Sequence, residues 1–333
     1  MGHGRSSARP SRGPARPLSG VLGTCAAGIV RAASVGTRVP TATGPSRRPL
    51  LTDHARHGSQ PVPAWKVAIR MITIPLPHEP TTSAAARRRP PLVRPRALLV
   101  DLDDTLLDGA HTALAIDGTC AALASSFALE KAQLREAYSA VWTALRPEVE
   151  LPCWLGQMNG EAALRETWRR ALRRAGLADE RAAEFAVERY QAIARSAYRL
   201  FPDVPGLFAT TARMQIPVVL VTNGPSDVQR DKLRALGLGS TFDAVAISGE
   251  IGSAKPDPAL FVAALHRIGA DHREVWHVGD GLTNDVGGAR AAGLVAVWLN
   301  RTGRPTPVDR CPDVEVTSLA QLSALLLGSA AAS

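Results

Sequence analysis

The stretch ALLVDLDDTL, residues 97–106, changes character at its fifth residue, Asp101. The four residues before it are apolar and form a short run typical of a strand buried on both faces. Three aspartates and a threonine follow within five positions. A buried strand that ends in carboxylates is typical of a parallel α/β sheet, where ligands bind at the carboxyl ends of the strands.

Further strands and helices are expected along the rest of the chain. Apolar runs predict strands at 217–221, 244–247, 275–278 and 294–299, and a last, short strand is expected at 314–316. Patterns of helical period lie between them, at 226–236, 258–268, 284–292 and 318–327. Asp257 and Thr283 are expected to cap two of these helices. Strands that alternate with helices predict an α/β fold, with a parallel sheet covered on both faces.

One segment interrupts this alternation. Residues 107–205 contain helical patterns at 131–145, 161–175 and 179–200 and no run typical of a strand. We therefore expect an α/β core formed by residues 96–107 and 206–329, with a helical subdomain at 108–205 inserted directly after the first strand.

Charge is distributed unevenly over the 333 residues. Residues 1–96 hold 16 Lys and Arg against 2 acidic residues, together with 14 of the 25 prolines, whereas the remainder has a net charge of −5. The composition of residues 1–95 predicts a disordered basic extension. This composition fits a translation start assigned too far upstream, with Met71 as the alternative start codon. It also fits an organelle transit peptide, a secretory signal or a nucleic-acid-binding arm. A nucleic-acid partner is not expected, because the arginine run 87–89 has no interleaved aromatic residues.

Partners and location follow from what the sequence lacks. It has no run of 18 apolar residues, so no membrane partner is expected. Its four cysteines form neither a CxxC pair nor a zinc spacing, which favours reduced thiols and a cytoplasmic protein. An organelle is the alternative location if residues 1–95 are a transit peptide. Nothing in the sequence determines the oligomeric state.

Polar residues that follow the expected strands have the composition of a metal and phosphate site. Packed carboxylates repel one another unless a cation or proton intervenes, and all-oxygen ligation of this kind suits Mg²⁺. Asp101 and Asp103, two apart in an extended chain, are expected to point the same way. A lysine and a hydroxyl beside such carboxylates are typical of phosphoryl transfer. The four carboxylates, the lysine and the hydroxyl are those of Asp101, Asp103, Asp280, Asp285, Lys255 and Thr222.

Four segments in order, VDLDDTL, VTNG, SAKPDP and HVGDGLTND, resemble the four motifs of the haloacid dehalogenase (HAD) superfamily. The resemblance covers residues 97–302. It implies a Rossmann-like parallel sheet as the core and identifies the inserted helices as a mobile cap.

The first motif carries the covalent chemistry in this resemblance. Asp101 resembles the nucleophile that forms an aspartyl-phosphate. It also resembles one of the Mg²⁺ ligands. Asp103 resembles the general acid/base, with its backbone carbonyl as a further Mg²⁺ ligand.

The remaining motifs imply binding roles. Thr222 and Asn223 resemble the phosphoryl-binding pair, and Lys255 resembles the lysine that steadies both nucleophile and phosphate. Asp280 resembles a direct Mg²⁺ ligand, and Asp285 its outer-shell or lysine-pairing partner.

Asp103 favours a Mg²⁺-dependent phosphatase of small phosphorylated metabolites, because family members that cleave carbon–halogen bonds lack a carboxylate at this position. A phosphomutase, a haloacid dehalogenase-type hydrolase and a non-catalytic binding protein stay open as alternatives. His277 is expected to be a core histidine. The cap arginines at 165, 169 and 170 are expected to form a solvated face, with an anion-binding role as the alternative.

Overall fold

The computed structural model describes residues 93–306 and 311–330. Apart from residues 93–95, the expected disordered extension lies outside the described residues. Within the described part of the chain, no helix is long and apolar enough to cross a membrane.

A six-stranded parallel sheet forms the centre of the core, in the order β3-β2-β1-β4-β5-β6. The strand order reverses beside β1, because β2 and β3 lie on one side of it and the later strands on the other. Such a reversal opens a crevice at the carboxyl ends of the strands. The strands are β1 (Ala97–Val100), β2 (Val218–Thr222), β3 (Ala244–Ile247), β4 (Val275–Gly279), β5 (Val295–Leu299) and β6 (Val314–Val316).

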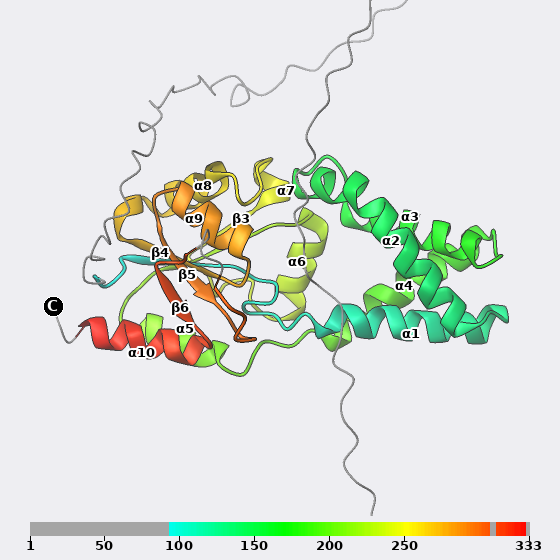
Figure 1. The fold of residues 1–333 in the computed structure, drawn as a ribbon, viewed down its shortest axis with the longest axis horizontal. Coiled ribbons are helices and arrows are strands. Elements are labelled where there is room, and N and C mark those ends of the chain that lie inside the picture. Colours follow the sequence, from blue (N-terminus) through cyan, green and yellow to red (C-terminus); the bar gives the residue numbers. More distant parts are fainter. Residues whose placement is uncertain (1–92, 307–310, 331–333) are drawn as a thin grey trace, which may run out of the picture. The chain divides into compact units, whose positions relative to one another are not determined.

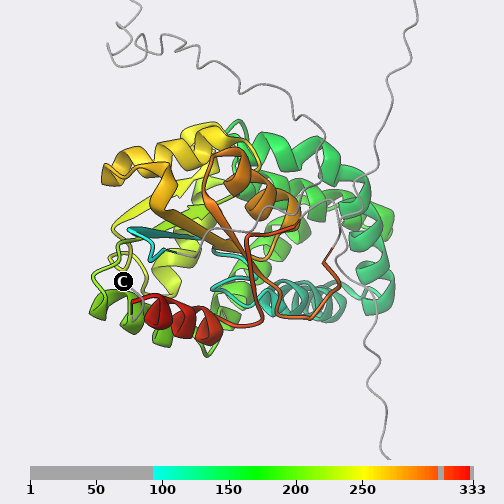
Figure 2. The ribbon, with the colours of Figure 1, turned by 60° about the vertical axis from the view of Figure 1, so that its left-hand side comes forward.

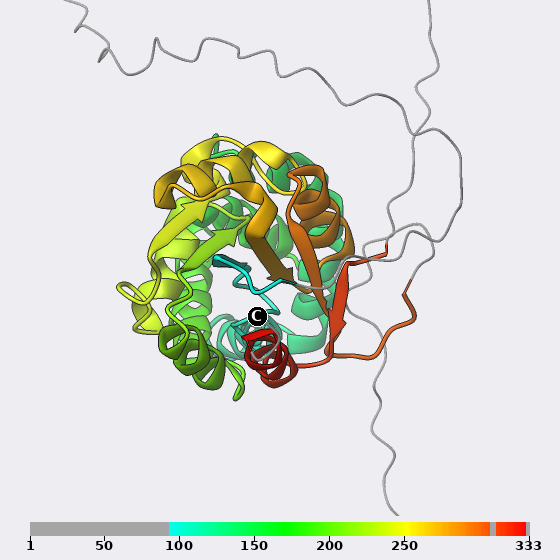
Figure 3. The same cartoon turned by 90° about the vertical axis from the view of Figure 1, so that its left-hand side faces the viewer.

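Helices cover both faces of this sheet, as Figure 3 shows. Alternate residues of β1 supply the two cores: Leu98 and Val100 belong to one apolar cluster and Leu99 to the other. One face is covered by α5 (Val204–Arg213), α6 (Ser226–Ala235) and α10 (Leu319–Ala330), and the other by α8 (Pro258–Ile268) and α9 (Gly288–Ala291). Two short elements, α7 (Ser248–Ile251) and η2 (His272–Glu274), complete the loops. The burial of both faces explains why the strands other than β6 are largely apolar runs, whereas Glu315 of the edge strand β6 is exposed.

The inserted segment forms a bundle of four helices with an apolar core of its own (Figures 1 and 2). Trp168 is fully buried there and packs against Tyr138, with ring centroids 4.5 Å apart. Two chain segments join this cap to the core, and they pair through a bridge between Leu107 and Leu200. The four helices are α1 (Ala110–Phe127), α2 (Lys131–Trp154), α3 (Gly160–Arg174) and α4 (Glu180–Ala197).

Most expected elements lie where the structure has them, with three differences. The helix expected at 131–145 continues to Trp154 in α2, α1 and α5 were not among the expected helices, and the chain departs from the expected pattern around residue 284. The helix expected at 284–292 is a π-helical turn, η3 (Leu282–Gly287), followed by α9. Thr283 does not cap it, because the turn begins after Gly281, whereas Asp257 does cap α8 by accepting from the amide of Ala259. Asp285 lies in this π turn, and such turns are frequent at functional sites.

Candidate active site

The polar residues selected from the sequence meet at the carboxyl edge of the sheet. Asp101 directly follows β1, Thr222 is the last residue of β2, and Asp280 directly follows β4. Lys255 comes from the loop between α7 and α8, and Asp285 from η3. These segments are far apart in sequence and adjacent at the strand ends because parallel strands all end at the same edge.

Lys255 lies at the centre of the arrangement. Its Nζ donates to Oδ1 of Asp101 and to Oδ1 of Asp285, each at 2.6 Å, and to the carbonyl of Val221 at 3.1 Å. The side chain of Lys255 is 3% exposed. Although burial by itself favours the neutral amine, the two carboxylates hold the pKa of Lys255 above its ordinary value. The lysine is therefore a fixed cation between two acidic side chains.

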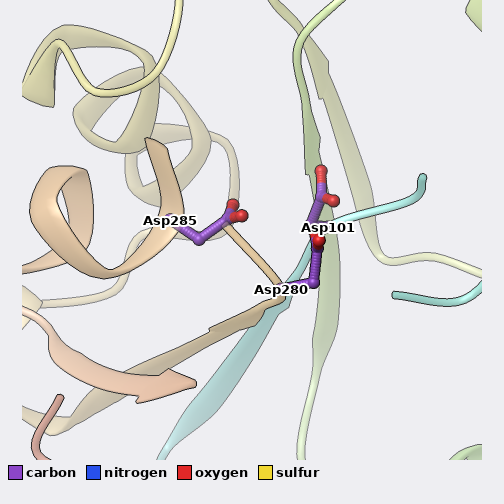
Figure 4. Close-up of side chains that lie close together, drawn as sticks. All are labelled: Asp101, Asp280 and Asp285. Carbon is purple, nitrogen blue, oxygen red and sulfur yellow. The ribbon is translucent and has the colours of Figure 1, made fainter. Parts of the chain in front are cut away.

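Three carboxylates converge beside this lysine, those of Asp101, Asp280 and Asp285 (Figure 4). Each offers one oxygen to a common space in which all three oxygens lie within 4.8 Å of one another. Burial raises the pKa of Asp101 well above its ordinary value and outweighs Lys255, which lowers it, while the neighbouring carboxylates add to the rise. Burial and Asp285 raise the pKa of Asp280 to about 7. The cluster therefore favours binding of a proton or a cation.

Asp285 is ionised and held from several sides. Burial alone would raise its pKa, but Lys255 and His277 outweigh burial and hold it below the ordinary value. His277 Nε2 donates to Asp285 Oδ1 at 2.9 Å, and the amide of Gly281 donates to Oδ2 at 2.9 Å. A Cβ on residue 279 would collide with the Asp285 carboxyl group, so glycine is required there. His277 is buried, as expected, but it also orients a site residue.

Asp103 is engaged differently from Asp101. Its carboxylate accepts from Lys232 Nζ at 2.7 and 2.9 Å and from Gln229 Nε2 at 3.0 Å. Burial alone would raise the pKa of Asp103, but Lys232 and these hydrogen bonds lower it. The two carboxylates therefore have different lysine partners, Lys255 for Asp101 and Lys232 for Asp103.

The second motif fixes the loops around the crevice. Thr222 is buried, and its hydroxyl oxygen accepts from Gln229 at 2.7 Å. The Asn223 side chain accepts from the backbone amide of Lys255 at 2.8 Å and donates to the Lys255 carbonyl at 2.9 Å. Asn223 therefore fixes the backbone that carries the central lysine.

A cavity of about 560 Å³ lies between the cap and α6. Its walls include Thr112 and Tyr190 from the cap, and Pro225 and Val228 from the core. Apolar and aromatic cap residues line much of the remainder, among them Ile116, Tyr138, Trp142 and Leu164.

The cap arginines singled out from the sequence form ion pairs within the cap. Arg165 pairs with Glu161 at 2.8 Å, and Arg169 and Arg170 both contact Glu166. These pairs support the solvated-face interpretation over an anion-binding role.

Gln229 and Lys232 were missed by the sequence analysis. The signal that marks them is their position on α6: residues 229, 232, 233 and 236 form one helical stripe. Leu233 and Leu236 on this stripe pack into the core, so a polar residue at position 229 or 232 also faces inward. Two buried polar side chains on an apolar stripe require partners nearby.

The fold and the ordered motifs place the chain in a known class. The chain belongs to the haloacid dehalogenase-like hydrolases, whose family model matches residues 95–293. It is similar to phosphoserine phosphatase from Thermus thermophilus, with 36% identity over 249 residues that cover 68% of this chain and 97% of the relative.

Solved structures give the same class. A magnesium-bound crystal structure of YfnB from Bacillus subtilis is 27% identical, with a TM-score of 0.53, and the match covers 70% of this chain and 99% of that one. A 2-haloacid dehalogenase from Pseudomonas syringae is 32% identical, with a TM-score of 0.53, and the match covers 70% and 97%.

Proposed function

We propose that this hydrolase is a Mg²⁺-dependent phosphatase that acts on small phosphorylated metabolites through an aspartyl-phosphate intermediate. One observation carries the proposal: Asp101 lies in a buried cluster with Lys255, Asp280 and Asp285, while Asp103 extends a second carboxylate toward α6. A nucleophile and a separate acid/base are the two groups that covalent phosphoester hydrolysis needs. Similarity to a phosphoserine phosphatase supports the same conclusion.

The donor set fits Mg²⁺. Three carboxylates supply only hard oxygen ligands within 4.8 Å of one another, and burial with mutual repulsion favours a cation among them. Asp101 and Asp280 would be direct ligands, with the Asp103 carbonyl as a third. Both Asp285 oxygens already accept hydrogen bonds, which suits the outer-shell or lysine-pairing role. When bound, Mg²⁺ supplies positive charge that offsets the phosphoryl oxygens and favours ionised Asp101.

In the first step, a carboxylate oxygen of Asp101 attacks phosphorus and the bond to the ester oxygen breaks. Asp103 enters this step protonated, against the lowering of its pKa by Lys232, and gives that proton to the departing oxygen, which therefore does not leave as an alkoxide. Lys255 holds Asp101 in place for the attack, and the Thr222 hydroxyl donates to a phosphoryl oxygen.

In the second step, Asp103 accepts a proton from water as the water oxygen attacks the phosphorus of the aspartyl-phosphate. The bond between phosphorus and Asp101 breaks, phosphate leaves, and both aspartates return to their starting states.

The cap cavity is the proposed place for the alcohol part of the substrate. At about 560 Å³ it suits a small metabolite, and its wall includes residues of α6, the helix whose Lys232 contacts Asp103. The alternatives stay distinguishable: a dehalogenase would release halide, a phosphomutase would return the phosphoryl group to substrate, and a binding protein would do neither.

A cytoplasmic location belongs to the same proposal.

The test is phosphate release from a broad panel of phosphomonoesters, with Mg²⁺ and with chelator. We expect Mg²⁺-dependent release, and we expect Asp101→Asn to lower kcat by at least about 10⁴-fold. Halide release from 2-haloacids is measured in parallel. No phosphate release from any substrate, or full activity of Asp101→Asn, would contradict the proposal.

A further inference from the structure

Helix α6 directs two buried polar side chains at the first and second motifs. Gln229 is 1% exposed and Lys232 is 8% exposed. Lys232 Nζ contacts both carboxylate oxygens of Asp103, at 2.7 and 2.9 Å. Gln229 Nε2 lies 3.0 Å from Asp103 Oδ2, 2.7 Å from Thr222 Oγ1 and 3.1 Å from the Asn223 carbonyl.

We propose that Gln229 and Lys232 form a clamp that positions Asp103 for proton transfer to the leaving group and orients the Thr222 hydroxyl toward the phosphoryl group. Both are positioning residues, because they act through Asp103 and Thr222. The inference rests on the proposed phosphatase function, which it extends from the four motifs to α6.

The first part of the argument concerns Asp103. Its side chain is 36% exposed, and its strand has already ended, so the carboxylate lacks the packing that fixes Asp101. A lysine that contacts both oxygens, with an amide on one of them, fixes the position of the carboxylate. Lys232 itself is buried, and a buried ammonium group is stable only with a partner. Both the carboxylate of Asp103 and the ammonium group of Lys232 therefore favour the pairing.

The second part concerns Thr222. Its oxygen accepts the Gln229 amide hydrogen at 2.7 Å, which occupies one lone pair. The hydroxyl itself donates to the Asn223 carbonyl at 3.4 Å, a long contact that a phosphoryl oxygen in the crevice can replace. One side-chain amide therefore connects the acid/base to the phosphoryl-binding hydroxyl.

The backbone around Gln229 is adapted to it. Gly224 has a φ of +146°, and a Cβ there would lie 2.9 Å from Cδ of Gln229. Glycine at this position leaves room for the amide of Gln229 directly behind the second motif.

The test compares two leaving groups. An alkyl phosphate from the substrate panel needs a proton on the departing oxygen, whereas p-nitrophenyl phosphate expels a stable phenolate. The ratio kcat/KM reports the first chemical step for both substrates. For Lys232→Met we expect kcat/KM to fall by about 10²-fold or more on the alkyl phosphate, and by only a few-fold on p-nitrophenyl phosphate. Asp103→Asn should show the same contrast.

Controls separate positioning from folding. Arg230→Met removes a two-contact ion pair with Glu250 from the same helix, at 2.7 and 2.8 Å, and does not contact Asp103. It should leave the contrast between substrates unchanged. Gln229→Leu tests the other half of the clamp if Lys232→Met fails to fold. An equal loss on both substrates, or no loss on either, would overturn the proposal.

A crystal structure of Lys232→Met gives a readout independent of turnover. We expect Asp103 to lose its position while the Lys255 contacts with Asp101 and Asp285 remain. An unmoved Asp103 would overturn the clamp. If the wild-type protein hydrolyses no phosphomonoester, the proposed function fails, and this structure still decides whether the clamp exists.

Discussion

Replacing Lys255 with methionine removes the cation on which the candidate site depends. The substitution keeps a chain of similar length and deletes the ammonium group that Asp101 and Asp285 each contact at 2.6 Å. Both carboxylates are buried and within 4.8 Å of each other, so the loss leaves two acidic groups facing one another.

The expected magnitude follows from these distances. Repulsion between the Asp101 and Asp285 carboxylates, whose oxygens lie within 4.8 Å of each other, is present in both proteins, so the cost arises from the lost attraction to the ammonium group. Removing one partner of a buried ion pair typically costs about 3–5 kcal/mol. Proton uptake by Asp101, whose pKa is already raised, relieves part of the cost as the pH falls. We therefore expect a loss of about 3 kcal/mol at pH 8 and a smaller loss at pH 6.

The assay is thermal unfolding followed by circular dichroism, in chelator, at both pH values. For a domain of this size, about 3 kcal/mol corresponds to a drop in Tm of roughly 6–12 °C. Adding Mg²⁺ should stabilise Lys255→Met more than the wild type, because a cation restores the missing charge. In a double-mutant cycle, Asp285→Asn combined with Lys255→Met should cost less than the two changes added separately.

A matched control uses the same substitution at an exposed pair. Lys131 contacts Asp117 at 2.8 Å, but both side chains are nearly half exposed. Lys131→Met should change the free energy of unfolding by less than about 1 kcal/mol. If Lys255→Met unfolds at the wild-type temperature in chelator at pH 8, Lys255 is not the charge that holds the carboxylates together.

Two further predictions concern the metal and the backbone around it. Because burial raises the pKa of Asp280 to about 7, Mg²⁺ must displace a proton below that pH, and its apparent affinity should fall about tenfold per pH unit. Calorimetry in two buffers of different ionisation enthalpy checks this through proton release on binding, and a pH-independent affinity between pH 5.5 and 7 would count against it. Gly279→Ala should cost about 1–3 kcal/mol and weaken Mg²⁺ binding, because the new Cβ collides with Asp285. Thermal unfolding and metal titration measure both effects, and wild-type values in both would refute the packing argument.

The local pattern of the sequence was sufficient to predict the sheet. The strands other than β6 are short, largely apolar runs, and a strand buried on both faces leaves that signal without help from distant residues. The polar residues that follow Val100 and Val278 could be predicted as site residues for a similar reason, since strand ends in parallel sheets meet at one edge. The order and spacing of the four motifs are sufficient to predict the family of the chain, and the family model agrees.

Which lysine contacts each aspartate could not be predicted in the same way. Asp101 and Asp103 are two residues apart, yet one contacts Lys255 and the other Lys232, because the chain turns after β1. The π-helical turn that delivers Asp285 was expected as an ordinary helix, since its hydrogen-bond pattern leaves no periodic signal in so short a segment.

The sequence by itself determined the strands, the inserted helices and the set of acidic residues, because these depend on local periodicity and on strand ends. Only the tertiary structure decided which cation each carboxylate contacts and that α6 contributes Gln229 and Lys232. Contacts of this kind join residues up to 154 positions apart. Their geometry depends on how the sheet, the loops and α6 pack together, which no short stretch of sequence encodes.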